Sequence, residues 1–475
     1  MNDGHASMRF RSHALVASRA AACLASFVIA GCSTMLPTLE DAERAAAARG
    51  PGSITIVGAD GTLMGERRSM IEERLARYRG TAGGLERKLA ITSAYTGSPL
   101  TVGNRTRILV DGPAAYRAIF DAIEAAREHV HIESFIFEEL DFERRLSDLL
   151  IRKAKEGVDV RVVYDSFGSI STPSAFLRGL DAGGVALCEY NPINPVRARL
   201  AFVHHRTHRK IVVVDGRVAF TGGINFHGVY RTGSGPMAGR RAGTVDEGWR
   251  DTHLKIEGPA VRELQSLFLE TWRKQNCGER APRSPYPRAS EEGEGIVSII
   301  GSAPDGTLSP MYLTLVTAIT YAEKSIFLTA AYFIPDPNTV NALKAAARRG
   351  VDVRLLLPGF TDSWLAFHAG RSHYEDLLAG GVRIFEYHGG LLHAKTAVVD
   401  GVWSTIGSSN VDWRSFCYND EVNAIVVGRG FGSDMDEIFR ADLAQATEIA
   451  QDKWAQRTPW ARSSETIARR FEQLL

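Results

Sequence analysis

From residue 108 onward, the chain alternates between amphipathic runs and shorter apolar runs. Residues 114–128 carry apolar positions at helical spacing, and residues 129–137 follow as a strand-like run. This alternation predicts an α/β sandwich, in which helices cover the faces of a sheet. A second pass of the same pattern begins near residue 296.

The two passes repeat one another in order and in approximate spacing. The matched phrases are Gly157-Val-Asp-Val-Arg-Val-Val with Gly350-Val-Asp-Val-Arg-Leu-Leu, Ala182-Gly-Gly-Val with Ala379-Gly-Gly-Val, and Glu189-Tyr190 with Glu386-Tyr387. A repeat of this length indicates two halves rather than a solenoid. We therefore expect an internal duplication into two lobes.

A linker divides the two passes. Residues 278–294 are rich in Pro, Ser, Arg and Glu, which is typical of an exposed connection. This predicts lobe 1 at 103–277 and lobe 2 at 295–475, the second ending in a helix. Residues 32–102 are expected to form a helical and linker region, and they offer no candidate chemistry.

The first 31 residues have the pattern of an export signal. Arg9, Arg11 and Arg19 precede an apolar stretch at 20–30 that is too short to span a bilayer comfortably. The run Ile29-Ala30-Gly31-Cys32 resembles the bacterial lipobox, which implies cleavage before Cys32 and lipid on that residue. We expect an exported, membrane-associated lipoprotein that faces the periplasm. An ordinary signal, or an uncleaved anchor with an incidental cysteine, remains open.

Charge and cysteine content exclude other classes. The 56 Lys and Arg residues nearly cancel the 55 Asp and Glu residues, so the chain lacks the basic balance of a nucleic-acid-coating protein. We expect no nucleic-acid partner, and any phosphate binding must be local. Beyond the signal, Cys188, Cys277 and Cys417 are widely spaced and odd in number. Neither a disulfide framework nor a zinc site is predicted.

A motif of the form His-x-Lys-x4-Asp occurs once in each pass. Its members are His208, Lys210 and Asp215, and then His393, Lys395 and Asp400. In a strand, residues two apart point to the same face, so each His projects with its Lys. Each Asp precedes a Gly between two apolar runs, which predicts a tight hairpin turn. A catalytic supporting role for the aspartate charge stays open beside that turn role.

Further polar residues recur at matching places after each motif. Asn225 and Asn410 follow small-residue turns, where an amide can approach an anionic oxygen closely. Asp251 and Glu421 each stand seven residues before a glycine, in matching apolar strands. Such an acid is a candidate for orienting a catalytic histidine, against the alternative of a solvated acid at a strand end.

These residue types suit phosphodiester chemistry. The reaction needs a nucleophile, an acid for the departing oxygen, and positive charge around the phosphate. Two histidines and two lysines supply all three, so neither a metal nor another cofactor is required. His204 and His205, close to His208, suggest a metal cluster, but the second copy has no equivalent trio.

The paired motifs resemble the phospholipase D superfamily, and the surrounding phrases are similar to its bacterial cardiolipin synthase branch. These phrases are Tyr190-Asn-Pro, His204-His-Arg-Thr-His-Arg-Lys, Gly222-Gly-Ile-Asn, Trp249-Arg-Asp, Ala331-Tyr-Phe-Ile-Pro-Asp and Ser408-Ser-Asn-Val-Asp-Trp-Arg. The resemblance extends from about residue 108 to the C-terminus. It implies two pseudo-twofold related α/β/α sandwich lobes that share one active-site cleft.

The resemblance also implies an activity. We expect a phosphatidyltransferase that works through a phosphohistidine, with His208 as nucleophile and His393 as acid. Lys210 and Lys395, with Asn225 and Asn410, would hold the phosphate oxygens. The expected reaction is cardiolipin synthesis from phosphatidylglycerol at a membrane surface. Hydrolysis of a phospholipid by water, and cleavage of nucleic acid, are the alternatives.

A lipid substrate requires contact with a bilayer. Aromatic and cationic residues mix near the C-terminus as they do in interfacial segments; they are Trp413, Arg414, Phe416, Trp454, Trp460, Arg462, Arg469, Arg470 and Phe471. A terminal helix packed on the core, with a solvated basic face, is the other interpretation.

Overall fold

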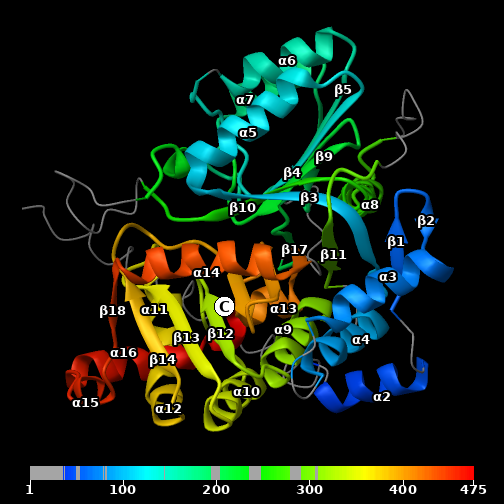
Figure 1. Ribbon diagram of the computed structural model, residues 1–475. Coiled ribbons are helices and arrows are strands. Elements are labelled where there is room, and N and C mark those ends of the chain that lie inside the picture. The colour runs from blue at the N-terminus through cyan, green and yellow to red at the C-terminus, as the bar shows by residue number, and fades with distance from the viewer. Residues whose placement is uncertain are drawn as a thin grey trace, which may run out of the picture.

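The structure is a computed structural model that describes residues 36, 38–49, 54–78, 80, 83–143, 145–193, 204–234, 248–278, 290–304 and 309–475. The expected signal segment 1–31 and Cys32 lie outside the described residues, as does most of the expected linker. The described chain forms two α/β lobes (Figure 1).

Lobe 1 contains one mixed sheet with helices on both faces. Its strands are β3 (Leu100–Val110), β4 (His129–Ser134), β5 (Asp159–Asp165), β6 (Ala186–Tyr190), β7 (Arg206–Thr207), β8 (Ile211–Val214), β9 (Val218–Gly222) and β10 (Thr252–Glu257). Its helices are α5 (Asp111–Ala125), α6 (Leu146–Lys155), α7 (Ser174–Ala182), the short η2 (Gly228–Tyr230) and α8 (Val261–Lys274). Pairing gives the order β6-β5-β4-β8-β9-β10-β3, parallel from β6 to β4 and antiparallel beyond.

Lobe 2 repeats this plan. Its strands are β11 (Gly295–Ser302), β12 (Ser325–Thr329), β13 (Asp352–Pro358), β14 (Arg383–Tyr387), β15 (Thr396–Val399), β16 (Trp403–Gly407), β17 (Asn419–Val427) and β18 (Ala446–Glu448). Its helices are α9 (Pro310–Thr320), α10 (Pro337–Arg348), α11 (Trp364–Arg371), α12 (Tyr374–Ala379), α13 (Trp413–Cys417), α14 (Arg429–Leu443), α15 (Gln451–Ala455), α16 (Pro459–Arg469) and the terminal η3 (Glu472–Leu474). The order β14-β13-β12-β15-β16-β17-β11 matches lobe 1 strand for strand, and β18 is added beside β14. The α/β class and the duplicated lobes are as predicted.

The two lobes share a core. Strand β8 is apolar throughout because its alternate side chains enter two different clusters. Val212 and Val214 pack beneath the outer helices of lobe 1. Ile211 and Val213 join residues of α8, β15 and β17 in a cluster between the lobes. Figure 1 shows α14 on the face of lobe 2 that is turned toward lobe 1, and β3 pairs with β11 across the junction.

The region before lobe 1 is folded against lobe 2. It contains α2 (Leu39–Arg49), β1 (Ile56–Gly58), β2 (Gly61–Thr62), α3 (Gly65–Ala76) and α4 (Gly84–Thr96). Leu85 and Leu89 of α4 enter the core cluster of lobe 2. In Figure 1 these helices lie beside lobe 2. The region is therefore more than a link, since it extends the second core.

The cysteine prediction was wrong. Cys188 in β6 and Cys277, just beyond α8, form a disulfide with Cα atoms 5.5 Å apart. The two residues are 89 positions apart in the sequence, and no spacing rule connects them. They meet because α8 packs back over the sheet of lobe 1.

The proposed interfacial residues divide into two groups. Trp413, Phe416 and Trp454 are buried in the core, so for these the packed interpretation holds. Trp460 is 78% exposed and Phe471 is 41% exposed. No helix of the described residues is long and apolar enough to cross a bilayer.

Candidate active site

Each His-x-Lys motif lies immediately before the central hairpin of its lobe. His208 and Lys210 precede β8, and His393 and Lys395 precede β15; all four side chains are buried. The segment containing each motif binds the other lobe. The His208 amide donates to the carbonyl oxygen of Asp420 at 2.8 Å.

The second motif makes the reciprocal contact. The His393 amide donates to the carbonyl oxygen of Arg250 at 2.7 Å. Asp420 and Arg250 are the residues directly before Glu421 and Asp251. The two contacts are therefore equivalent under exchange of the lobes, and they bring both motifs to one junction.

The acids that were expected to orient the histidines contact them across this junction. His208 Nδ1 lies 3.0 Å from each carboxylate oxygen of Glu421, which belongs to lobe 2. His393 Nδ1 lies 2.7 Å from Oδ2 of Asp251, which belongs to lobe 1. Both acids are completely buried. With Nδ1 engaged in this way, Nε2 of each ring is the atom left to react.

Burial dominates the titration of the four basic groups. It lowers the pKa of His208 to about 4, against the opposing effect of Glu421. Burial also lowers the pKa of Lys210 to about 7 and that of Lys395 to about 8. The pKa of His393 is held well below its usual value, by burial first and then by the charges of Lys395, Lys210 and His208.

The two acids respond differently to the same junction. Burial raises the pKa of Asp251 to about 6. Burial alone would also raise the pKa of Glu421, but His208 and Lys210 together lower it below its usual range. Glu421 is therefore the more firmly ionised partner. A bound phosphodiester, being an anion, would favour the charged forms of all four bases.

The immediate neighbours of the two rings also differ. The Phe135 ring meets His208 edge-on, with centroids 5.3 Å apart. His393 instead contacts the Trp249 ring, and its Nδ1 lies 3.0 Å from both the Tyr230 hydroxyl and Lys395 Nζ. The two halves of the site are therefore equivalent in backbone and different in surroundings.

Sequence reasoning missed several of these neighbours. Tyr230 has no counterpart in the second copy and no periodic cue, so nothing predicted it. Trp249 lies two residues before the predicted Asp251, and Ser408 lies in a quoted turn and donates a hydrogen bond from its hydroxyl group to Glu421. Gly223 occupies the place of Ser408 in lobe 1, where a Cβ would lie 2.1 Å from Asp251 Oδ1. Glycine at 223 is thus required by the acid beside it.

The two asparagines lie at the ends of β9 and β16, next to the motifs. Asn225 accepts a hydrogen bond from the Ile136 amide at 3.3 Å through Oδ1. The backbone amide of Asn410 donates to Ser415 Oγ at 3.1 Å, and Asn410 lines a small pocket together with Lys395. Its buried Oδ1 has no hydrogen-bond partner among the described residues.

Asp215 and Asp400 lie away from the histidines, at the far ends of β8 and β15. Asp215 accepts hydrogen bonds from the amides of residues 127–129 at 2.8–2.9 Å. Asp400 accepts from the amides of residues 323–325 and from Lys88 Nζ at 2.8 Å. Seven residues of extended chain, about 20 Å, separate each Asp from its His. Both aspartates have positive φ and hold the hairpin turn, which supports the turn interpretation.

Among the described residues, no cluster of three His, Cys, Asp or Glu side chains has the arrangement of a metal site. Every predicted site residue that the structure describes is thus accounted for. Eight lie at the junction of the lobes, and the two aspartates lie at the turns. Cys32 is outside the described residues.

Comparisons with known proteins match this chain to one family. A family model described as "Cardiolipin synthase, PLD-like domain" matches residues 119–229 and 315–443. A cardiolipin synthase of Geobacillus thermodenitrificans (strain NG80-2) is 38% identical over 384 residues, which cover 79% of this chain and 74% of that one. A cardiolipin synthase of Halalkalibacterium halodurans is 34% identical over 415 residues, covering 86% of this chain and 79% of that one.

A solved structure supports the fold alone. The phosphatidylserine synthase of Haemophilus influenzae Rd KW20 superimposes with a TM-score of 0.55 at 11% identity, covering 78% of this chain and 93% of that chain. The paired motifs, the duplicated lobes and the matches over most of the chain agree. The chain belongs to the cardiolipin synthase family of phospholipase D-like proteins.

Proposed function

We propose that the protein transfers a phosphatidyl group from one phosphatidylglycerol molecule to a hydroxyl of another, which yields cardiolipin and glycerol. The observation that carries this proposal is the pair of histidine–carboxylate contacts that cross between the lobes, each beside a buried lysine. The similarity to proteins named cardiolipin synthase supports the choice of substrate.

In the first step, His208 Nε2 attacks phosphorus and the bond from phosphorus to the glycerol oxygen breaks. His393 donates its proton to that oxygen, so glycerol leaves as a neutral alcohol and phosphohistidine remains. Glu421 favours His208 for this role because an ionised carboxylate accepts a hydrogen bond from Nδ1–H and stabilises the positive ring that forms.

In the second step, a hydroxyl of the second phosphatidylglycerol attacks phosphorus while His393 removes its proton. The bond between phosphorus and His208 breaks, and cardiolipin leaves. Lys210 and Lys395, with Asn225 and Asn410, would surround the non-bridging oxygens and stabilise the charge that they carry in both transition states.

We also propose that the mature protein is exported and anchored by lipid on Cys32. The disulfide between Cys188 and Cys277 supports export, because such bonds persist in oxidising compartments and are rare in the cytosol. Incorporation of labelled fatty acid that is lost in Cys32→Ser would support the anchor. Retained labelling in that variant would contradict it.

The activity is tested by lipid mass spectrometry after the protein is incubated with phosphatidylglycerol vesicles. Cardiolipin together with glycerol is the expected result. Phosphatidic acid without cardiolipin would mean that water is the acceptor, and the protein would then be a hydrolase. Cleavage of nucleic acid without any lipid product would overturn the proposal altogether.

A further inference from the structure

Ile136 of lobe 1 and Tyr332 of lobe 2 occupy equivalent places beside the site. The Phe226 amide donates to the carbonyl oxygen of Ile136 at 3.2 Å, and the Val411 amide donates to that of Tyr332 at 3.2 Å. Phe226 and Val411 directly follow Asn225 and Asn410. Lobe 1 therefore has the aliphatic side chain of Ile136 at the place where lobe 2 has the phenol of Tyr332.

The loops after the equivalent strands β5 and β13 also differ in polarity, with the apolar side chains in lobe 1. In lobe 1, this loop carries Phe167 and Ile170, which are 56% and 66% exposed. In lobe 2, it carries Thr361 and Asp362, and the side chain of Asp362 is exposed. The lobe 1 loop thus exposes two apolar side chains, whereas the lobe 2 loop exposes a carboxylate shortly before Trp364, which is 53% exposed.

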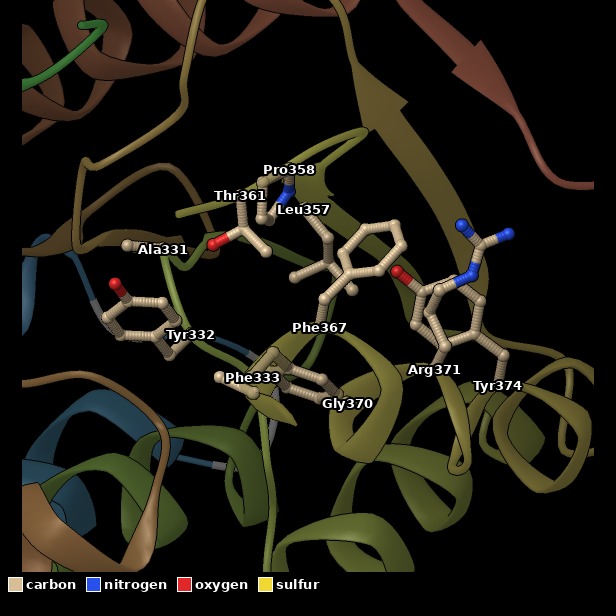
Figure 2. Close-up of a pocket in the computed structure, with 11 residues that line it drawn as sticks. Ala331, Tyr332, Phe333, Leu357, Pro358, Thr361, Phe367, Gly370, Arg371 and Tyr374 are labelled. Atoms are coloured by element: carbon tan, nitrogen blue, oxygen red, sulfur yellow. The ribbon is translucent and has the colours of Figure 1, made fainter. Parts of the chain in front are cut away.

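The polar groups of the lobe 2 loop are arranged around the carboxylate of Asp362. Tyr332 Oη donates to Asp362 Oδ1 at 2.6 Å, and Thr361 Oγ1 donates to the same oxygen at 3.0 Å. Figure 2 shows the hydroxyl groups of Tyr332 and Thr361 at one end of a pocket whose other end holds Arg371 and Tyr374. The carboxylate is therefore held in place by two hydroxyl groups while it still meets solvent.

Backbone pairing places Tyr332, which holds this carboxylate, on the His393 side of the site. Tyr332 follows β12, whose last residue Thr329 pairs with Thr396, the residue after Lys395. The charge of Asp362 also raises the pKa values of His393 and Lys395 against the burial that lowers them. An acid beside a phosphate site repels the substrate, so its presence calls for a partner that donates hydrogen bonds.

We propose that Asp362, positioned by Tyr332, binds the hydroxyl groups of the alcohol that leaves and enters on the His393 side, while the apolar loop of lobe 1 contacts the diacylglycerol portion. The inference rests on the proposed function and assigns the two ends of its substrate. In an in-line displacement, the leaving oxygen lies opposite the nucleophile, which places the alcohol next to His393. A carboxylate forms strong, charge-assisted hydrogen bonds with hydroxyl groups.

The test measures how one covalent intermediate is divided between two acceptors. The full-length protein receives phosphatidyl-p-nitrophenol as donor, with glycerol as acceptor. The ratio of phosphatidylglycerol to phosphatidic acid compares capture by glycerol with capture by water, and it does not depend on how fast the intermediate forms. Asp362→Ala is expected to lower this ratio about tenfold or more, and higher glycerol concentrations should restore it.

Two further variants make the result specific. Tyr332→Phe removes the hydroxyl that holds Asp362 and should lower the ratio in the same direction, which keeps the test open if Asp362→Ala fails to fold. Asp376→Asn makes a similar charge change at an exposed residue of α12, which pairs with Lys344, and should leave the ratio at the wild-type value.

The outcomes separate this inference from the proposed function. If the wild-type protein forms no phospholipid product from phosphatidylglycerol or from phosphatidyl-p-nitrophenol, the proposed function itself fails. If the wild-type protein transfers normally and Asp362→Ala keeps the wild-type ratio, only this inference is overturned. A wild-type preference for ethanolamine over glycerol that disappears in Asp362→Ala would also overturn it, since the carboxylate would then recognise an ammonium group.

Discussion

His208 and His393 belong to identical motifs, yet their Nδ1 atoms have different partners. His208 Nδ1 bonds to the carboxylate of Glu421. His393 Nδ1 lies within hydrogen-bond distance of three groups, which belong to Asp251, Tyr230 and Lys395. A symmetric pair of rings would have no reason to divide the labour of a two-step transfer. The unequal surroundings give the two histidines different roles, because they stabilise a positively charged ring more strongly at His208.

Separate roles for the histidines predict separate losses. His208→Asn should abolish turnover of every donor, because the proposed mechanism then has no nucleophile and His393 serves as the acid. His393→Asn should lower turnover of phosphatidylglycerol by about 10² to 10⁴, the contribution of a general acid. With a p-nitrophenol donor, whose leaving group needs no proton, His393→Asn should still release a burst of nitrophenolate. Stopped-flow absorbance checks this, and a burst from His208→Asn would contradict the assignment.

Glu421 should also set the pH dependence. Its carboxylate raises the pKa of His208 against burial, which lowers that pKa to about 4. In Glu421→Gln this support is lost, so the pKa of His208 falls further and the acid limb of kcat/KM moves to lower pH. At neutral pH, kcat/KM should fall about 100-fold or more, because the ring loses its orienting anion. Ser408→Ala, which removes a neutral contact to the same acid, should move the limb much less. An acid limb that shifts upward would refute the account.

At this scale the sequence predicted residue types better than partnerships. The motif identified His208 and His393, and the repeat identified Asp251 and Glu421 as acids. It could not tell which acid holds which histidine, because spacing along a chain carries no information about contacts between lobes. Tyr332 and Asp362 were equally hidden, since each gains meaning only from its counterpart in the other lobe.

Among the elements, the hairpins after β8 and β15 follow most directly from the sequence. The Asp-Gly pairs predicted tight turns, and both residues of each pair have positive φ, as such turns require. The carboxylates then accept amides at the start of β4 and β12, which the sequence did not reveal. From that contact we infer a structural role for Asp215 and Asp400.

The turn aspartates should therefore affect stability rather than rate. Asp215→Ala should lower the free energy of unfolding by about 2 kcal/mol, because three amides lose an acceptor. Asp400→Ala should cost about 3 to 5 kcal/mol, because it also leaves the buried Lys88 without its ion-pair partner. Urea denaturation measures both changes. The folded fraction of each variant should keep kcat within about threefold of wild type, and a loss comparable to that of His393→Asn would restore these residues to catalysis.

Helix α16 has the form of an interfacial element. Its buried face includes Ala468, which packs against Ala366 and Ala369 of α11. Trp460 and Ile467 are seven residues apart and share an exposed face. The nearby Arg462, Arg469 and Arg470 are also exposed, which suits a bilayer of anionic phospholipids.

We expect Trp460→Ser with Ile467→Ser to lower the rate on phosphatidylglycerol vesicles about tenfold or more, through lost burial of apolar surface in the bilayer. The rate on monomeric, short-chain phosphatidylglycerol should stay near wild type. Met64→Ser with Met70→Ser, at two exposed methionines before lobe 1, is the matched control and should change neither rate. If both substrates are affected equally by the α16 changes, the helix does not dock on lipid.

For the whole molecule, duplication was the most predictable property. Phrases such as Gly157-Val-Asp-Val and Gly350-Val-Asp-Val recur because equivalent helix ends and buried strands need the same residues. The docking of residues 54–96 on lobe 2 was not predictable, since Leu85 and Leu89 carry no signal that distinguishes one apolar surface from another. The disulfide was missed for a related reason, because it depends on how α8 returns to β6.

The disulfide gives a test of both stability and compartment. Cys188→Ser should lower the free energy of unfolding by about 2 to 4 kcal/mol, because the crosslink restrains a long loop in the unfolded chain. In protein taken from the native cell envelope, Cys188 and Cys277 should resist alkylation until a reductant is added. Mass spectrometry after alkylation measures this. Prompt labelling of both residues would argue against the bond and against export.

The exchange of acids between lobes has a consequence for the life of the chain before it is finished. Each half on its own has a histidine that lacks its counter-ion, so we expect a nascent, truncated or cleaved polypeptide to be inactive toward lipids. Reactivity arises only at the last stage of assembly, when the halves close on one another. Incomplete copies should therefore leave the membranes of the cell that makes them intact.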